Sequence, residues 1–111
     1  MEVRTVLFRI VQESITNIIR HAKTDQAEVS VIFDEDLICI CVDDKGSGFD
    51  VDATLHKPGD RCWGLLGMIE RATLIGADCH FISEPGKGTR VEVRVPFKEK
   101  DDVGNSTVVG G

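Results

Sequence analysis

The sequence predicts an α/β two-layer sandwich, with helices on a single face of a mixed, mostly antiparallel sheet. Three observations support this fold class: an amphipathic helical pattern opens the chain, alternating strand patterns follow it, and the elements run in the order helix, two strands, loop, helix, two strands. A sheet of paired hairpins that has one solvent-exposed face needs helices only on its other face.

The two helices are predicted from the spacing of their apolar residues. Between residues 3 and 22, apolar side chains recur at steps of three and four, as one face of a helix requires. A second helical pattern spans residues 65–75. Gly64 and Gly67 stand at its start, and Gly76 stands where a left-handed cap would end it.

The strands are predicted from alternation and from turn residues between them. The last of them has valines that alternate with charged residues, so one of its faces should be wet. Residues 45–63 have no convincing period and contain several glycines and a proline, so we expect a long functional or mobile loop there. The predicted strands are residues 27–33, 37–42, 79–83 and 89–97.

Length and composition indicate one domain, residues 1–97, followed by a disordered tail at residues 98–111. The formal net charge of -6 argues against a nucleic-acid surface, because phosphate neutralisation needs clustered basic residues. The longest apolar run, residues 37–42, is far shorter than the roughly 20 residues of a membrane helix. We therefore expect a cytoplasmic domain without membrane contact, which leaves open that the parent protein is membrane-anchored.

The four cysteines have no paired CxxC spacing, so neither a metal site nor a disulfide framework is expected from them.

The candidate chemistry starts on the first helix, where Glu13, Asn17 and His21 are spaced by four, with Arg20 beside them. They form a polar stripe at the border of the apolar face. Such a stripe is also the ordinary boundary between an amphipathic helix and solvent.

A second candidate lies at the end of the second strand. Alternation places Asp44 on the same face as Ile38, Ile40 and Val42. If the helices cover this face, the Asp44 carboxylate should be buried or half-buried and in need of hydrogen-bond donors. Gly46 and Gly48 follow it and would let a flat base approach the backbone, although any tight turn can use such glycines.

The segment from Gly64 to Gly67 is a third candidate. A helix that starts there would direct free backbone N–H groups toward phosphate oxygens. Two glycines at a helix start are unremarkable by themselves.

Four motifs in order resemble the GHKL ATPases, and more closely the catalytic domains of two-component sensor histidine kinases of the nitrate-sensor and degradation-sensor type. The resemblance covers residues 7–97 and implies a Bergerat-type ATP-binding fold. The motifs are QESITNIIRHA at 12–22, DDKGSGF at 43–49, GLLGM at 64–68 and PGKGT at 85–89.

The resemblance implies roles for the helix residues. Asn17 would coordinate the Mg²⁺ ion that bridges the ATP phosphates. Glu13, where many relatives carry Asn, would orient a metal-bound water or assist the acceptor. Arg20 and His21 would reach the phosphates.

The resemblance also implies roles for the strand ends and the loop. Asp44 would accept from the adenine amino group, and Thr89 would share a water with that acid and the base. Residues 49–63, beginning at Phe49, would form an ATP lid. The segment that closes over the phosphates would be Gly64, Leu65, Leu66 and Gly67.

The reaction implied is transfer of the γ-phosphoryl group of ATP to a histidine on a dimerisation domain, with a response regulator as the next partner of the parent kinase. The chain resembles the phosphoryl donor half only, as an excised fragment, and it is not expected to phosphorylate itself. His21, His56 and His80 lie in the predicted helix, lid and sheet, away from the helical hairpin that carries the acceptor in this family.

Three alternatives remain. An anti-sigma-type serine kinase shares the fold and the Asn and DxGxG elements. A non-catalytic module of the same fold would use ATP only to change its partner contacts. A two-layer domain without any ligand accounts for each motif singly, though not for four in order.

Overall fold

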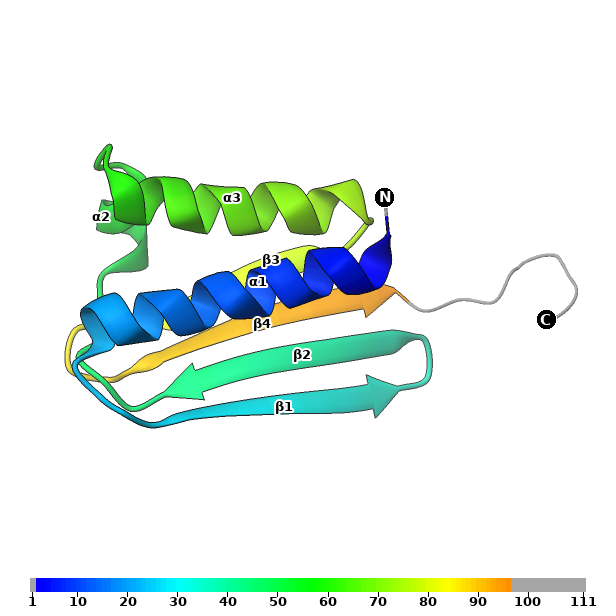
Figure 1. Ribbon diagram of the computed structural model, residues 1–111, viewed down its shortest axis with the longest axis horizontal. Coiled ribbons are helices and arrows are strands. Elements are labelled where there is room, and N and C mark those ends of the chain that lie inside the picture. The colour runs from blue at the N-terminus through cyan, green and yellow to red at the C-terminus, as the bar shows by residue number, and fades with distance from the viewer. Residues whose placement is uncertain (1, 97–111) are drawn as a thin grey trace, which may run out of the picture.

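The computed structural model describes residues 2–96 and has two layers, with helices on one face of an open sheet (Figure 1). The predicted fold class is therefore confirmed, whereas the predicted tail at 98–111 lies outside the described residues. In chain order the elements are α1 (Val3–Asn17), the π-helix η1 (Ile18–Ala22), β1 (Ala27–Asp34), β2 (Leu37–Asp44), α2 (Val51–Leu55), α3 (Asp60–Leu74), β3 (Asp78–Ser83) and β4 (Thr89–Pro96). No helix within residues 2–96 has the length and apolarity needed to cross a membrane.

The sheet has the strand order β1-β2-β4-β3, and each of the three pairings between the described strands is antiparallel. The hairpins β1–β2 and β3–β4 join through β2 and β4, so two strands from distant parts of the sequence form the centre. In that central ladder Asp44 lies opposite Thr89, and Val42 lies opposite Val91. Residues that are two apart share a face, so all four side chains project toward the helices.

The core lies between the sheet and the long helices α1 and α3, which pack side by side. Burial of these apolar side chains supplies most of the favourable free energy of folding. The helices contribute one stripe each, and β4 contributes alternate residues. The buried apolar set includes Val6, Ile10, Ile18, Leu65, Met68, Ala72, Val42, Val91, Val93 and Val95.

The structure corrects the predicted loop at residues 45–63. It contains the short helix α2, and α3 begins at Asp60, five residues before the predicted start. The Asp50 side chain caps α2 by accepting a hydrogen bond from the Ala53 N–H at 2.9 Å. Part of the glycine and proline content that indicated a loop marks the start of α3 instead, because Gly59 caps this helix and Pro58 precedes Gly59.

Because α3 begins at Asp60, the two glycines expected at its start lie further along the helix. Gly64 and Gly67 lie inside α3, where backbone N–H groups bond to carbonyls four residues earlier. With α3 in this form, the amides of residues 64–67 are not free to receive phosphate oxygens. The prediction of a helix N-terminus at Gly64 is therefore wrong.

The first helix covers residues 3–22 as predicted, but its last turn is a π-helix that starts at Ile18. Its core stripe is also displaced from the predicted one. Ser14 is buried and donates to the Ile10 carbonyl at 2.8 Å, whereas Ile15, one of the apolar residues in the predicted helical pattern, is exposed. The wider π turn means that 100° per residue no longer relates Asn17 to His21.

Candidate functional site

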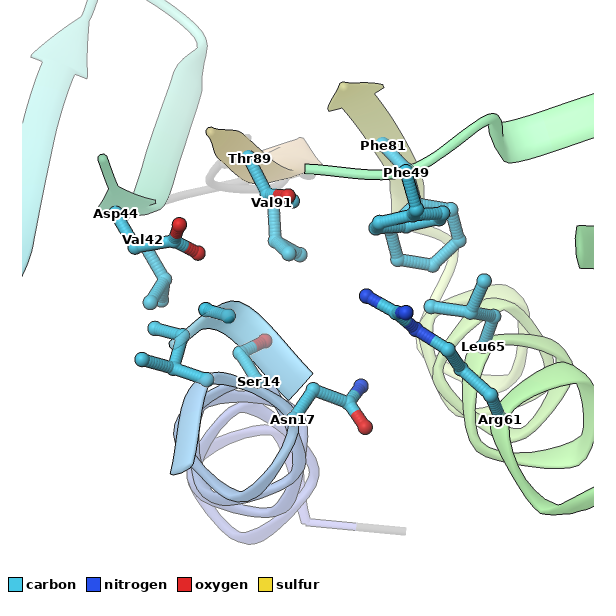
Figure 2. A pocket seen from close by; sticks show the side chains of 12 residues that line it. Ser14, Asn17, Val42, Asp44, Phe49, Arg61, Leu65, Phe81, Thr89 and Val91 are labelled. Atoms are coloured by element: carbon cyan, nitrogen blue, oxygen red, sulfur yellow. The ribbon is translucent and has the colours of Figure 1, made fainter. Parts of the chain in front are cut away.

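A small cavity lies between α1, the start of α3 and the ends of the central strands, and has a volume of about 20 Å³. Figure 2 shows polar groups from opposite walls directed toward this common space. Five of the residues singled out from the sequence line it. They are Asn17, Asp44, Phe49, Leu65 and Thr89, joined there by Ser14, Ile18, Ala22, Val42, Arg61, Phe81 and Val91.

Asp44 ends β2 on the helix side of the sheet, as its alternation predicts. One carboxylate oxygen accepts a hydrogen bond from the Gly46 N–H at 2.7 Å. The described residues supply no hydrogen bond to the second oxygen, and the carboxylate is turned toward the cavity (Figure 2). The side chain thus holds its own loop with one oxygen and keeps the other available to a ligand that donates hydrogen bonds.

Thr89, opposite Asp44, is held by Ser83, a residue that the sequence reasoning did not single out. The Ser83 hydroxyl donates to the Gly88 carbonyl and lies 2.8 Å from the Thr89 hydroxyl. It also accepts from the Phe49 N–H at 2.9 Å. Because a serine has only one O–H proton, Thr89 must donate to Ser83, which leaves the Thr89 oxygen as an acceptor toward the cavity.

Of the four polar residues predicted as a stripe on the first helix, only one lines the cavity. Asn17 lines it from the last residue of α1. Glu13 is half-buried and faces α3, since a Cβ added at Gly64 would lie 2.8 Å from its Oε2. Arg20 is exposed, and His21 is half-buried, but neither lines the cavity.

Partial burial lowers the pKa of His21, and the positive charges of Arg61 and Arg20 lower it further. The depressed pKa favours the neutral imidazole. His21 is therefore a hydrogen-bonding group rather than a fixed positive charge.

Gly46 and Gly48, in the loop after Asp44, allow this loop to pack closely against the backbone of neighbouring segments. A Cβ at Gly46 would collide with the Ala22 carbonyl oxygen, and one at Gly48, where φ is 64°, would collide with the Glu84 carbonyl oxygen. The loop is also tied to the end of η1 by a 2.7 Å hydrogen bond from the Ser47 N–H to the Ala22 carbonyl. Neither glycine lines the cavity, and their visible effect is to fix the turn that follows Asp44.

Arg61 is the cavity residue whose role the sequence reasoning missed. Its guanidinium lies over the Phe49 ring, with the central carbon 4.1 Å from the ring centroid. Residues 60–63 were assigned to a loop, so no side-chain direction could be inferred. The spacing of Cys62, Leu65 and Met68, continued backward as a helix, was the signal that would have placed Arg61 beside the buried face.

The remaining predicted residues of α3 lie outside the cavity. Leu66 is exposed, and Gly64 and Gly67 are half-buried within the helix. Leu65 alone of this segment reaches the cavity.

Comparison with known proteins finds relatives that match most of this chain. The sensor protein VraS of Staphylococcus haemolyticus is 41% identical over 96 residues, which are 86% of this chain and 26% of that protein. The chain thus spans about a quarter of the length of this curated relative. A similar match, 39% identical over 95 residues, is found to VraS of Staphylococcus saprophyticus subsp. saprophyticus.

The fold agrees with solved structures at lower identity. The ATP binding domain of PrrB from Mycobacterium tuberculosis superposes with a TM-score of 0.70 at 22% identity, covering 86% of this chain and 69% of that one. The family model described as histidine kinase-, DNA gyrase B-, and HSP90-like ATPase matches residues 2–99. The chain therefore belongs to this ATPase family, as its four motifs predict.

Proposed function

We propose that this chain is the ATP-binding catalytic domain of a two-component sensor histidine kinase, which binds Mg-ATP and presents the γ-phosphoryl group to a histidine on a separate dimerisation domain. The observation that supports it best is the pairing of Asp44 and Thr89 at the end of the central ladder, with the Asn17 amide on the facing helix. A response regulator would then be the next partner of the parent kinase.

The polar end of the cavity suits adenine. The second Asp44 oxygen, which receives no hydrogen bond from residues 2–96, can accept the N–H of the exocyclic amino group of adenine. Guanine carries a carbonyl oxygen at that position, so two acceptors would face each other, and the mismatch disfavours GTP. The walls on either side are apolar, with Val42, Val91 and Phe81 among them, as a flat aromatic base requires.

The side chains of α1 suit a hard cation. Asn17 offers an amide oxygen at the cavity, and Glu13 lies one turn earlier on the same helix. The described residues contain no cluster of three or more His, Cys, Asp or Glu that could hold a metal by themselves. Mg²⁺ often takes only one or two protein ligands and completes its shell with waters and substrate phosphates, so this sparse donor set fits it.

When bound, Mg²⁺ would neutralise charge on the phosphate oxygens during phosphoryl transfer. The chain's own contribution is to orient the nucleotide and to hold the phosphates at a fixed position. The His21 carbonyl accepts a hydrogen bond from the Ser47 hydroxyl in the loop that follows Asp44, so η1 ends next to this loop. Arg20 and His21, both in η1, would donate to phosphate oxygens there.

The test is the melting temperature of the chain with ATP, ADP or GTP, with and without Mg²⁺. A ligand at 100 times its Kd stabilises the folded state by about 2.7 kcal/mol, which should raise the melting temperature by several degrees. ATP with Mg²⁺ should stabilise the chain more than GTP does. Asp44→Asn should remove most of that preference, because it replaces an acceptor oxygen with an amide that can also donate.

The matched control is Asp43→Asn. Asp43 lies on the other face of the sheet and accepts a hydrogen bond from Arg90 at 2.6 Å. This variant should change the stability of the chain but keep the preference for ATP over GTP. Equal stabilisation of the wild-type chain by ATP and GTP would contradict the role proposed for Asp44.

A further inference from the structure

Arg61 is the basic side chain, among the described residues, that lines the cavity. It belongs to the first turn of α3 and extends into the space between Asn17 and Phe49 (Figure 2). The flat guanidinium lies over the Phe49 ring at 4.1 Å, within the range of a cation–π contact. A planar cation therefore occupies the aromatic surface of the cavity.

The polar groups of Arg61 are poorly satisfied in this position. Its Nε–H is buried and has no hydrogen-bond acceptor among the described residues. Burial lowers the pKa of Arg61, and the charge of the Asp44 carboxylate acts in the opposite direction. No hydrogen bond or ion pair joins Arg61 to Asp44 within residues 2–96, so the guanidinium is held by stacking and lacks an anion of its own.

The free space beside Arg61 is too small for a nucleotide. A volume of about 20 Å³ holds roughly one water molecule. A purine can enter only if a side chain leaves, and Arg61 is long, flexible and incompletely bonded. Gly59, just before α3, has no atom within 4 Å of the position of an added Cβ, so little packing surrounds the residue that precedes Arg61's helical turn.

We propose that Arg61 closes the nucleotide site of the empty domain, leaves Phe49 when a nucleotide enters, and then pairs with the phosphates. This inference rests on the proposed function. The displaced guanidinium needs an acceptor, and its planar fork of N–H groups matches phosphate oxygens. A chain with a formal net charge of -6 also needs a local cation to hold a polyanion.

The experiment compares adenosine with Mg-ATP, because adenosine has the base but no phosphates. Arg61→Ala and Arg61→Lys are titrated with both ligands by calorimetry or NMR. Arg9→Ala is the matched control, since Arg9 is an exposed arginine on α1 outside the cavity. Far-UV circular dichroism checks that each variant is folded, and the emission of Trp63, the only tryptophan, reports movement of the first turn of α3.

Arg61→Ala should bind adenosine at least about threefold more tightly, because the binding-competent site no longer has to be opened. It should bind Mg-ATP more weakly, so the ratio of the adenosine Kd to the ATP Kd should fall at least about tenfold. Arg61→Lys keeps the charge but loses the flat stack, so it should gain adenosine affinity and retain most ATP affinity. Arg9→Ala should leave both affinities unchanged.

Unchanged or weaker adenosine binding in both Arg61 variants would overturn the closing role. An equal gain for adenosine and ATP in Arg61→Ala would overturn the phosphate contact. If the wild-type chain binds neither ATP nor ADP, the proposed function fails and this inference fails with it, a result distinct from either of the other two.

Discussion

At the scale of a single residue, His21 makes the stability of the folded chain depend on pH. Its pKa in the folded chain lies below the ordinary value of 6.5, chiefly because of burial. The unfolded chain therefore binds a proton more readily than the folded chain. The stability that this difference supplies is fully present above the unfolded pKa and is lost as the pH falls through 6.5 toward the folded pKa.

We expect His21→Gln to lose less unfolding free energy than the wild-type chain between pH 7.5 and pH 5.5. The measurement is urea unfolding at both pH values, which cancels the titration of other groups that are common to the two proteins. His80→Gln is the control, because His80 is exposed on β3 and outside the cavity. An identical loss of stability in His21→Gln and wild type would show that His21 does not titrate differently on folding.

At the scale of elements, the turn after Asp44 depends on a glycine contact that can be tested. Gly48 has a φ of 64°, and a Cβ there would collide with the Glu84 carbonyl oxygen. Gly86 has a φ of 82° but has nothing within 4 Å of such a Cβ. An added side chain would strain the left-handed backbone at both positions. Only at Gly48 would it also collide with another part of the chain.

Gly86→Ala should lower the unfolding free energy by about 1–2 kcal/mol, from left-handed backbone strain alone. Gly48→Ala should lower it by at least about 3 kcal/mol, because the collision is with rigid backbone and adds an overpacking cost. Chemical denaturation measures both. Similar losses in the two variants would mean that the β3–β4 turn yields easily and does not fix the loop after Asp44.

The elements also show where sequence reasoning succeeds. The apolar run located β2, and the period of two placed Asp44 on the same face as Ile38, Ile40 and Val42. The sequence did not decide which face the helices cover, because both faces of the run are apolar, and the structure shows that it is this one. The sequence also could not show that Ser83 would bond to both Phe49 and Thr89, since that contact needs the β3–β4 register and the loop together.

The misplaced start of α3 and the π-helix η1 have different causes. Glycine and proline mark a boundary without showing on which side the helix lies, so residues 60–63 were assigned to a loop. The apolar spacing of residues 3–22 fits an α-helix throughout and does not distinguish a π turn at its end, which is a rare feature of helices. Arg61, within the misassigned segment, was consequently missed.

At the scale of the whole molecule, the sheet extends beyond its helix layer. β1 is an edge strand, and it lies clear of both long helices (Figure 1). Val29, Val31 and Phe33 share the face of Val42 and Ile40 but remain 49%, 50% and 76% exposed. An edge with unpaired backbone groups and exposed apolar side chains is a template for pairing with another chain.

We expect the chain to self-associate through β1 at high concentration, and Phe33→Lys to weaken that association. The substitution removes the most exposed apolar side chain of the strand and adds a charge that natural edge strands use to block pairing. Sedimentation measures the association, and the unfolding free energy should change by less than about 0.5 kcal/mol. Leu74→Lys is the control, because it removes another largely exposed apolar side chain, 65% exposed, at the end of α3. If it reduced association as strongly, general surface hydrophobicity rather than the β1 edge would be the cause.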